Sequence, residues 1–164
     1  MADQFNAEEV LTMAVRIEQN GQAFYCSAAD AAKGEKATRL LKDLSQWEKG
    51  HENTFKAMKS NLTEEEKGKT AIDPYGEEAM YLKTMADQHV FRNNDEESFE
   101  SMLKDMETGD IIDLALDFEK DSLLFFLGLA RLVSKRLGKE EVYGVIDEEI
   151  SHISYLENLR TELT

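Results

Sequence analysis

The chain contains almost no cysteine and almost no proline. Its 164 residues include one cysteine, Cys26, and one proline, Pro74. A single cysteine excludes an internal disulfide and any cysteine-ligated zinc or iron–sulfur module built from this chain alone. We therefore expect Cys26 to be a small buried apolar side chain. The scarcity of proline, together with few alternating β-branched runs, predicts an all-α protein.

Basic residues and long apolar runs are also scarce. The chain has 19 lysines and arginines against 34 acidic residues, which gives a formal net charge of −15. This charge repels phosphate backbones and anionic lipids, so we expect neither nucleic acid nor membrane as a partner. No window approaches the roughly 20 apolar residues of a membrane-spanning helix, and the N-terminus lacks the pattern of a signal peptide. We expect a cytoplasmic protein with one domain over residues 1–164.

Apolar residues recur at helical spacing in four segments. The predicted helices span residues 6–32, 35–60, 108–137 and 139–160. Asn6 can cap the first helix, with Glu9 answering three residues later, and Gly138 is a stop signal for the third. The intervening residues 61–107 form too long a connection to be structureless, so we expect short helices in this crossover. Two antiparallel hairpins joined by one long crossover predict a ferritin-like four-helix bundle.

The two halves of the chain repeat at a constant offset. The segment AVRIEQNGQAFYCSAA (14–29) aligns without a gap on ALDFEKDSLLFFLGLA (115–130), and WEKGH aligns on EEISH. Three residues of the first half that could bind a metal each have an identical residue 101 positions later. These pairs are Glu18 and Glu119, Glu48 and Glu149, and His51 and His152.

The repeated residues face the interior of the predicted bundle. Glu18 and Glu119 lie within the apolar stripes of their helices, and both residues of each Glu-x-x-His lie on one helix face. Four carboxylates in a core repel one another, and each costs several kcal/mol to desolvate unless it is protonated or paired. No basic residue stands at a matching position, whereas two metal ions would supply the pairing. Carboxylates with one imidazole per metal suit iron or manganese, and the lack of thiolates argues against structural zinc.

Glutamates from two helices plus Glu-x-x-His from two others are typical of di-iron and di-manganese carboxylate bundles. A lone Glu-x-x-His is more often a surface or capping histidine, and it is the repeat that favours metal ligation. By symmetry we infer that Glu18 and His51 hold one metal and that Glu119 and His152 hold the second. Glu48 and Glu149 would bridge the two metals.

Three further residues, an aromatic on the same helix face, a tryptophan and a third histidine, are candidates for a role near this set. Tyr25 lies seven residues after Glu18 on the same helix face, so it is either a hydrogen-bond donor or redox-active group near one metal, or a core aromatic. Trp47, adjacent to a predicted ligand, is interpreted as packing. His89 has neither a Glu-x-x-His partner nor a repeat equivalent, so we interpret it as structural or exposed.

At these segments the chain resembles the rubrerythrin-like branch of the ferritin-like superfamily, from about Asn6 to Arg160. IEQNGQAFY, WEKGH, FEKDSLLFF and EEISH carry the resemblance. It implies a non-haem di-iron site in a four-helix bundle and metal-dependent reduction of hydrogen peroxide or dioxygen, as in oxidative-stress defence. It also implies assembly into a homodimer.

Departures from the family pattern narrow these expectations. Rubrerythrins proper carry a rubredoxin-like domain with four cysteines, which Cys26 alone cannot supply, so the electron donor is expected to be external, either a rubredoxin-like protein or a reductase. Ser122 stands where rubrerythrins have an extra glutamate, and Gly21 stands where some relatives have one. Lys49 and Gly50 replace the haem-binding methionine of bacterioferritins, so no haem is expected. Without the short fifth helix of cage-forming ferritins, no storage shell is expected.

The sequence therefore predicts a di-iron oxidoreductase whose two iron ions cycle between Fe2+ and Fe3+, with manganese or zinc as alternative metals. The carboxylates Glu18, Glu48, Glu119 and Glu149 would act as its metal ligands. Two other classes stay open. One is a non-catalytic iron-binding or iron/redox-sensing protein without cage storage. The other is a structural bundle that holds zinc or nothing.

Overall fold

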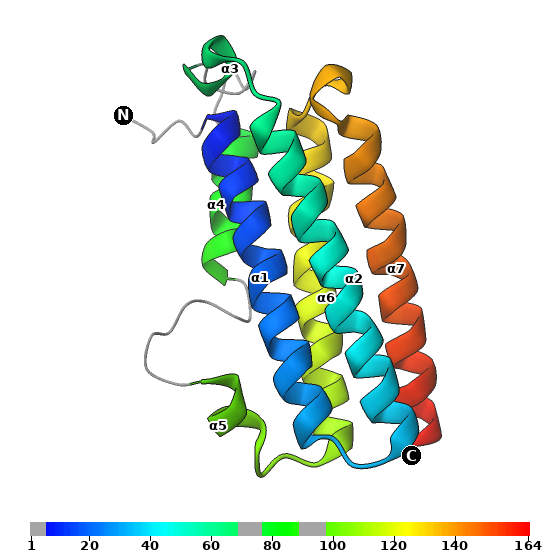
Figure 1. Cartoon of the computed structure of the whole chain (residues 1–164). Coiled ribbons are helices and arrows are strands. Elements are labelled where there is room, and N and C mark those ends of the chain that lie inside the picture. The colour runs from blue at the N-terminus through cyan, green and yellow to red at the C-terminus, as the bar shows by residue number, and fades with distance from the viewer. Residues whose placement is uncertain (1–5, 69–76, 89–97) are drawn as a thin grey trace.

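The computed structural model describes residues 6–68, 77–88 and 98–164, and its long helices form one bundle (Figure 1). The predicted all-α architecture, with two hairpins and a partly helical crossover, is confirmed. The four bundle helices are α1 (Ala7–Ala31), α2 (Glu35–Ser60), α6 (Thr108–Leu132) and α7 (Lys139–Glu162).

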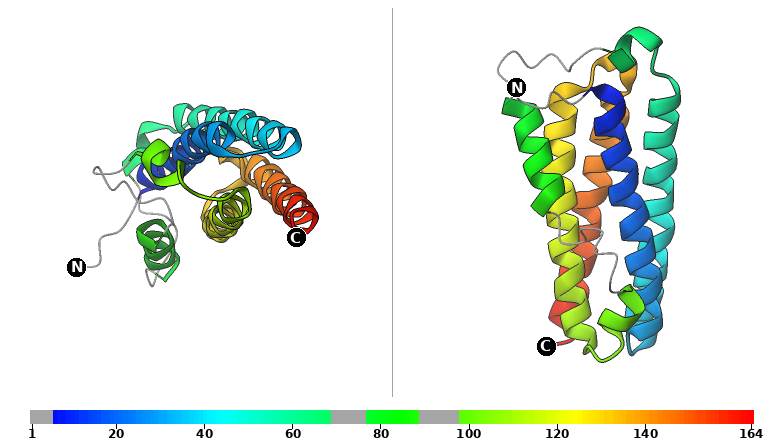
Figure 2. Two further views of the ribbon diagram at one scale, coloured as in Figure 1. Left: turned by 90° about the horizontal axis from the view of Figure 1, so that it is seen from below. Right: turned by 90° about the vertical axis from the view of Figure 1, so that its left-hand side faces the viewer.

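α1 packs against α2 and α6 packs against α7, which gives the two antiparallel hairpins (Figure 2). The capping box expected at the start of α1 is present: the Asn6 side chain accepts the Glu9 amide N–H at 2.9 Å, and Glu9 accepts the Asn6 N–H at 3.0 Å. Gly34 adopts φ = 101° in the tight turn between α1 and α2, a backbone conformation that favours glycine. Local chemistry thus fixes the start of α1 and the turn that follows it.

The third predicted helix is shorter than expected. α6 ends at Leu132 rather than at Leu137, because Val133 is extended and the Ser134 side chain caps a separate 3₁₀ turn, η1 (Lys135–Leu137). A serine side chain that bonds to the nearby backbone offers an alternative to continuing the helix. Gly138, at φ = 105°, therefore ends η1 and leads into α7 instead of terminating α6.

The crossover contains three short helices within its described part, α3 (Glu64–Gly68), α4 (Glu77–Gln88) and α5 (Phe99–Leu103). α4 packs against α6 and α5 packs against α1 (Figure 2). Gly128 permits the approach of α4, since an added Cβ would lie 2.5 Å from the Tyr81 ring, whose hydroxyl donates to the Leu124 carbonyl at 2.6 Å. His89 lies outside the described residues.

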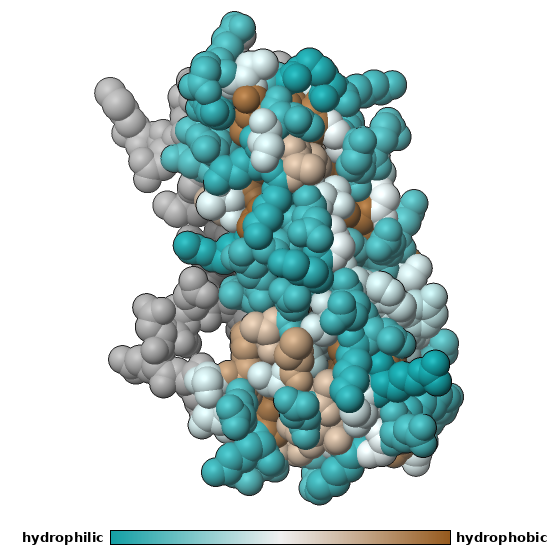
Figure 3. All heavy atoms as spheres, in the orientation of Figure 1, coloured by the Kyte–Doolittle hydropathy of each residue, from teal (hydrophilic) through white to brown (hydrophobic). Residues whose placement is uncertain are grey.

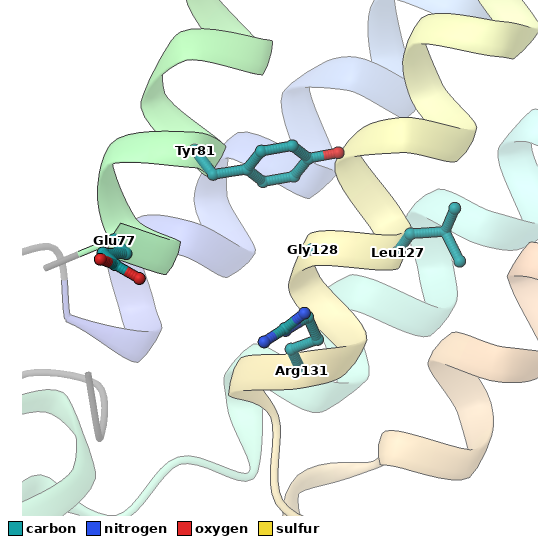
Figure 4. Close-up of a pocket in the computed structure, with 5 residues that line it drawn as sticks. All are labelled: Glu77, Tyr81, Leu127, Gly128 and Arg131. Atoms are coloured by element: carbon teal, nitrogen blue, oxygen red, sulfur yellow. The ribbon is translucent and has the colours of Figure 1, made fainter. Parts of the chain in front are cut away.

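A hollow of about 390 Å³ lies on the surface between α4 and α6 (Figure 4). Glu77, Tyr81, Leu127, Gly128 and Arg131 line it, and none of the predicted metal ligands borders it. The hollow is therefore separate from the candidate site.

The apolar core follows the inner faces of all four bundle helices, and the face of the molecule seen in Figure 3 is mostly hydrophilic. The buried-thiol expectation for Cys26 was wrong: the residue is exposed, with Sγ 3.0 Å from Ser45 Oγ. Its neighbour Tyr25 takes the core-facing position of α1, so Cys26 is turned toward the surface. Within the described residues, no helix is long and apolar enough to cross a membrane.

Candidate metal centre

All six predicted metal ligands lie together inside the bundle, and none is more than 3% exposed. α1 and α6 each supply one glutamate at a core-facing position. α2 and α7 each supply a Glu-x-x-His whose two residues share a face because they are one turn apart. The predicted ligands are Glu18 on α1, Glu48 and His51 on α2, Glu119 on α6, and Glu149 and His152 on α7.

The ligand atoms form two overlapping groups of four residues. One group contains Glu18, Glu48, His51 and Glu149, and the other contains Glu48, Glu119, Glu149 and His152. Within each group the ligand atoms all lie within 4.8 Å of one another. Only Glu48 and Glu149 belong to both groups, which are the positions that the repeat assigned to bridging carboxylates.

Both histidines point the same ring nitrogen at the carboxylates. His51 Nδ1 lies 3.0 Å from Glu149 and 3.7 Å from Glu18. His152 Nδ1 lies 3.4 Å from Glu48, 3.5 Å from Glu119 and 3.9 Å from Glu149. The two imidazoles are nearly parallel, with ring centroids 5.4 Å apart. Nδ1 is therefore the nitrogen available to a metal in each half of the site.

Most polar atoms of the cluster have no hydrogen-bond partner in the described part of the chain. These atoms are both carboxylate oxygens of Glu18, Glu48 and Glu149, one oxygen of Glu119, and Nδ1 of both histidines. Buried polar atoms are normally paired, because an unpaired one loses its hydration without compensation. A set of anionic oxygens and imidazole nitrogens that converge without partners fits coordinated cations. The donor set suits iron or manganese better than a structural zinc.

The pKa shifts of the cluster also fit a site that binds cations. Burial, and then the charge of Glu48, raises the pKa of Glu18 well above its usual value, and burial with the charges of Glu119 and Glu48 does the same to the pKa of Glu149. Burial opposes ionisation of Glu48, but its contacts with Glu18 and His152 outweigh burial and lower its pKa. Burial likewise disfavours the charged form of His152, yet Glu119 and Glu48 raise its pKa to about 9. Protons neutralise the excess negative charge when no cation does so.

Tyr25 is part of the site. Its ring is fully buried, and its hydroxyl donates a hydrogen bond to Glu119 on the opposite hairpin. Burial, and then the charge of Glu119, raises the pKa of Tyr25 well above its usual value, so the phenol keeps its proton. Tyr25 is thus both a core aromatic and the donor that orients one ligand. Its repeat equivalent, Phe126, has no hydroxyl to offer.

Sequence reasoning missed Glu148. Its carboxylate is largely exposed and lies 2.9 Å from Nε2 of His51, on the side of the ring away from the cluster. Such a contact fixes the ring orientation and leaves Nδ1 free for a metal. The sequence gives little sign of this role, because Glu148 stands next to the predicted ligand Glu149 within the aligned segment EEISH. Its repeat equivalent is Trp47, and that mismatch was the available clue.

Trp47 also contacts the site, although packing alone was expected of it. Its ring stacks on His152 with centroids 5.2 Å apart and planes 14° apart. The indole also contacts Tyr155, at 5.8 Å between centroids. Trp47 therefore covers the ligand histidine of one half of the site, while Glu148 supports the ligand histidine of the other.

Glu52 is a further buried acid that sequence reasoning passed over. It is 2% exposed and accepts hydrogen bonds from Gln19 at 3.0 Å and Lys49 at 2.7 Å, with Lys56 Nζ at 2.5 Å. Burial opposes its ionisation, but Lys49, Lys56 and Gln19 lower its pKa to about 2. The lysines three residues before and four after Glu52 were the signal in the sequence. Through Gln19, the residue next to Glu18, Glu52 ties α1 to α2 beside the ligands.

The positions of the absent family glutamates are also defined. A Cβ added at Gly21 would lie 2.5 Å from the Phe118 ring and 3.1 Å from a Glu48 oxygen, so no larger residue fits there without displacing both. Ser122, the repeat equivalent of Gly21, is buried at 1% exposure. Neither position offers a carboxylate to the cluster.

Comparison with known proteins agrees with this geometry. A crystal structure of a protein from Thermotoga maritima, assigned as a ferritin-like diiron-carboxylate protein, superposes with a TM-score of 0.72 over 100% of both chains at 21% identity, which shows the shared fold. No curated protein matches the sequence. The family model for rubrerythrin matches residues 9–160. The chain, with its buried cluster of glutamates and histidines, therefore belongs to the rubrerythrin family.

Proposed function

We propose that this protein is a non-haem di-iron oxidoreductase that reduces hydrogen peroxide or dioxygen. The observation that carries the proposal is the convergence of unpaired buried oxygens and nitrogens in two overlapping groups that share Glu48 and Glu149. Two cations held by shared carboxylates lie close enough to act on one small oxidant together. Membership of the rubrerythrin family and the donor set support iron as the metal.

When bound, two ferrous ions supply two electrons, which with two protons convert hydrogen peroxide into two molecules of water. The residues of the chain have separate tasks around that chemistry. Glu48 and Glu149, which belong to both ligand groups, would hold both metals, and each histidine would offer Nδ1 to one of them. Tyr25 holds Glu119 in place and keeps a proton on its hydroxyl inside the core. The closely packed apolar residues around the cluster keep bulk water from it.

An iron-binding protein that turns over slowly or not at all is a second candidate. The observation that favours it is the pair Gly21 and Ser122. Ser122 stands where rubrerythrins carry an extra glutamate, Gly21 stands where some relatives carry one, and Phe118 fills the space at Gly21. A site without a further carboxylate has fewer ways to change its coordination as the metal charge changes.

The proposal includes two protein partners, an electron donor and a second copy of this chain. The one cysteine of the chain cannot supply the four ligands of a rubredoxin-like iron centre, so an external donor, either a rubredoxin-like protein or a reductase, would restore the ferrous state. The chain would also form a homodimer. Exposed apolar side chains on the adjacent helices α6 and α7 support that assembly, namely Leu124, Leu127 and Ile150.

The test begins with protein loaded anaerobically with Fe(II). Metal is measured per chain, then hydrogen peroxide or air is added, and oxidation is followed by stopped-flow absorbance. About two irons per chain, oxidised rapidly by peroxide, are expected of the oxidoreductase. Two irons with sluggish oxidation would instead support the iron-binding candidate.

A stability measurement gives an independent control. Because a ligand that binds only the folded state stabilises it by about 2.7 kcal/mol at a hundredfold excess over its dissociation constant, the loaded protein should melt at a clearly higher temperature than the metal-free protein. Equal melting temperatures would contradict the assignment of the buried cluster as a metal site.

A further inference from the structure

The two ligand histidines have different neighbours on the side away from the carboxylates. His51 is held by the carboxylate of Glu148, whereas His152 is stacked against the ring of Trp47. Trp47 and Glu148 are equivalent positions of the repeat, so the chain departs from its own symmetry at this contact. A departure from the repeat in direct contact with two repeated histidines is where a task specific to one half is expected.

Four rings form a continuous stack from the surface to both histidines. Tyr155 contacts Trp47 at 5.8 Å between centroids, Trp47 contacts His152 at 5.2 Å, and His152 contacts His51 at 5.4 Å. The last two contacts are nearly parallel, with interplanar angles of 14° and 18°. At the outer end Trp47 is 37% exposed and Tyr155 is 48% exposed, while both histidines are buried. We call these four residues the ring stack.

We infer that the ring stack is the route by which electrons enter the metal centre from an external one-electron donor that docks over Trp47 and Tyr155. The inference rests on the proposed function, since it requires a redox-active metal at the histidines. Exposed tryptophan and tyrosine are side chains that protein interfaces favour. The helices that carry them, α2 and α7, lie side by side on one face of the bundle (Figure 1).

The electron balance is simple. In each cycle two donor molecules each lose one electron, and the oxidised metal pair at the histidines gains both electrons. The rings transmit the electrons without net oxidation or reduction. No covalent bond forms or breaks in the ring stack, and the protons consumed in the reaction are taken up with peroxide.

A second line of aromatic rings approaches the site from the other side and provides a rival route. Phe99 on α5 lies 5.8 Å from Phe24, Phe24 lies 5.1 Å from Tyr25, and Tyr25 reaches Glu119 through its hydroxyl. This line ends on a ligand carboxylate through a hydrogen bond rather than on a ligand histidine through ring contact. Both Phe24 and Tyr25 are fully buried. We therefore favour the ring stack.

The test measures how fast the oxidised iron protein takes electrons from a small donor. Iron-loaded protein is oxidised with ferricyanide, desalted, and mixed anaerobically with the methyl viologen radical cation, whose loss of colour reports electron transfer. The variants are Trp47→Leu, Trp47→Phe and Tyr155→Leu. The matched control is Tyr143→Leu, an equally exposed tyrosine of α7, and Phe99→Leu tests the rival line.

We expect Trp47→Leu and Tyr155→Leu to slow decolouration several-fold at unchanged iron content, with Trp47→Phe intermediate. The Tyr143→Leu and Phe99→Leu variants should match the parent. Parent-like rates in Trp47→Leu, or a slow rate in Phe99→Leu alone, overturn the inference while the proposed function stands. If the parent chain binds no iron, both the inference and the proposed function are overturned. The iron assay therefore distinguishes failure of the inference alone from failure of the proposed function. Thermal melts show whether each variant is folded.

Fluorescence provides a readout that needs no turnover. Trp47 is the sole tryptophan of the chain, so its emission reports on the ring that touches His152. Addition of Co(II) to the metal-free protein should quench this emission strongly. Unchanged emission with Co(II) bound would show that the indole is not coupled to the metal position, and that result would overturn the inference.

Discussion

The α1–α2 hairpin and the α6–α7 hairpin supply the same ligand types at the same spacing, but each receives different support from the other. Glu148 on α7 forms a hydrogen bond with His51 of the first hairpin, and Trp47 on α2 stacks on His152 of the second. Tyr25 donates to Glu119, whereas its equivalent Phe126 has no hydroxyl. The ligands follow the symmetry of the repeat and their surroundings do not. The two halves of the site are therefore chemically inequivalent.

The largest expected effect separates shared ligands from unshared ones. Glu48 belongs to both ligand groups and Glu18 to one, although both are fully buried glutamates. Glu48→Ala should lose nearly all bound iron, while Glu18→Ala should retain about one of the two ions typical of such sites. Iron measured per chain after anaerobic loading and desalting tests this difference. Equal losses in the two variants would show that the site does not divide into two halves as assigned.

The next effect concerns packing between the hairpins. Gly21→Ala forces a methyl group against Phe118, and overpacking of this kind costs about 1–3 kcal/mol, more than the helix propensity that alanine gains. The matched control is Gly144→Ala on α7, where an added Cβ meets nothing within 4 Å, so the variant should be more stable by about 0.5–1 kcal/mol. Urea unfolding of both variants measures the two signs. A stabilised Gly21→Ala variant would refute the close contact.

A smaller effect is expected at the carboxylate behind His51. Glu148→Ala should weaken metal binding in that half by about 10–100-fold, the usual consequence of removing a partner that orients a ligand histidine. Competition with a chelator of known affinity measures the change, which should affect one of the two ions. Glu157→Ala is the control, because Glu157 is an exposed acid on the same helix and lies 3.9 Å from Lys120. Identical affinities in the two variants would reduce Glu148 to a surface contact.

The smallest effect tests a surface ion pair of the second hairpin. Arg160 donates to Asp113 at 2.5 and 3.0 Å, and the side chains are 31% and 51% exposed. Asp113→Asn should therefore cost at most about 1 kcal/mol and leave the iron content unchanged. The hydrogen bond from Arg160 lowers the pKa of Asp113, so this stabilisation is present above the usual aspartate pKa and is lost as pH falls through the lowered value. Urea unfolding at neutral and acid pH should show the difference only at neutral pH.

Much of the fold and of the candidate site follows from the sequence. The helical periodicity predicts the bundle helices because an apolar stripe must be buried along each of them. The end of α6 was misplaced by five residues, since Gly138 was read as its stop while Ser134 had already begun a separate turn. The sequence did not single out Glu52 as buried, because most acidic residues of the chain lie on the surface; its ion pairs with Lys49 and Lys56 offset the cost of burying its charge.

By itself, the sequence identified the six candidate ligands, because two Glu-x-x-His motifs and two glutamates within apolar stripes repeat at a constant offset of 101 residues, which is visible without a structure. Tertiary structure alone decided which neighbour each ligand meets. Glu148 reaches His51, Trp47 covers His152 and Tyr25 reaches Glu119 only because packing fixes how far each helix is rotated and shifted against the next. The spacing of residues within one helix therefore identifies the candidate ligands, and the register between helices determines which side chains surround them.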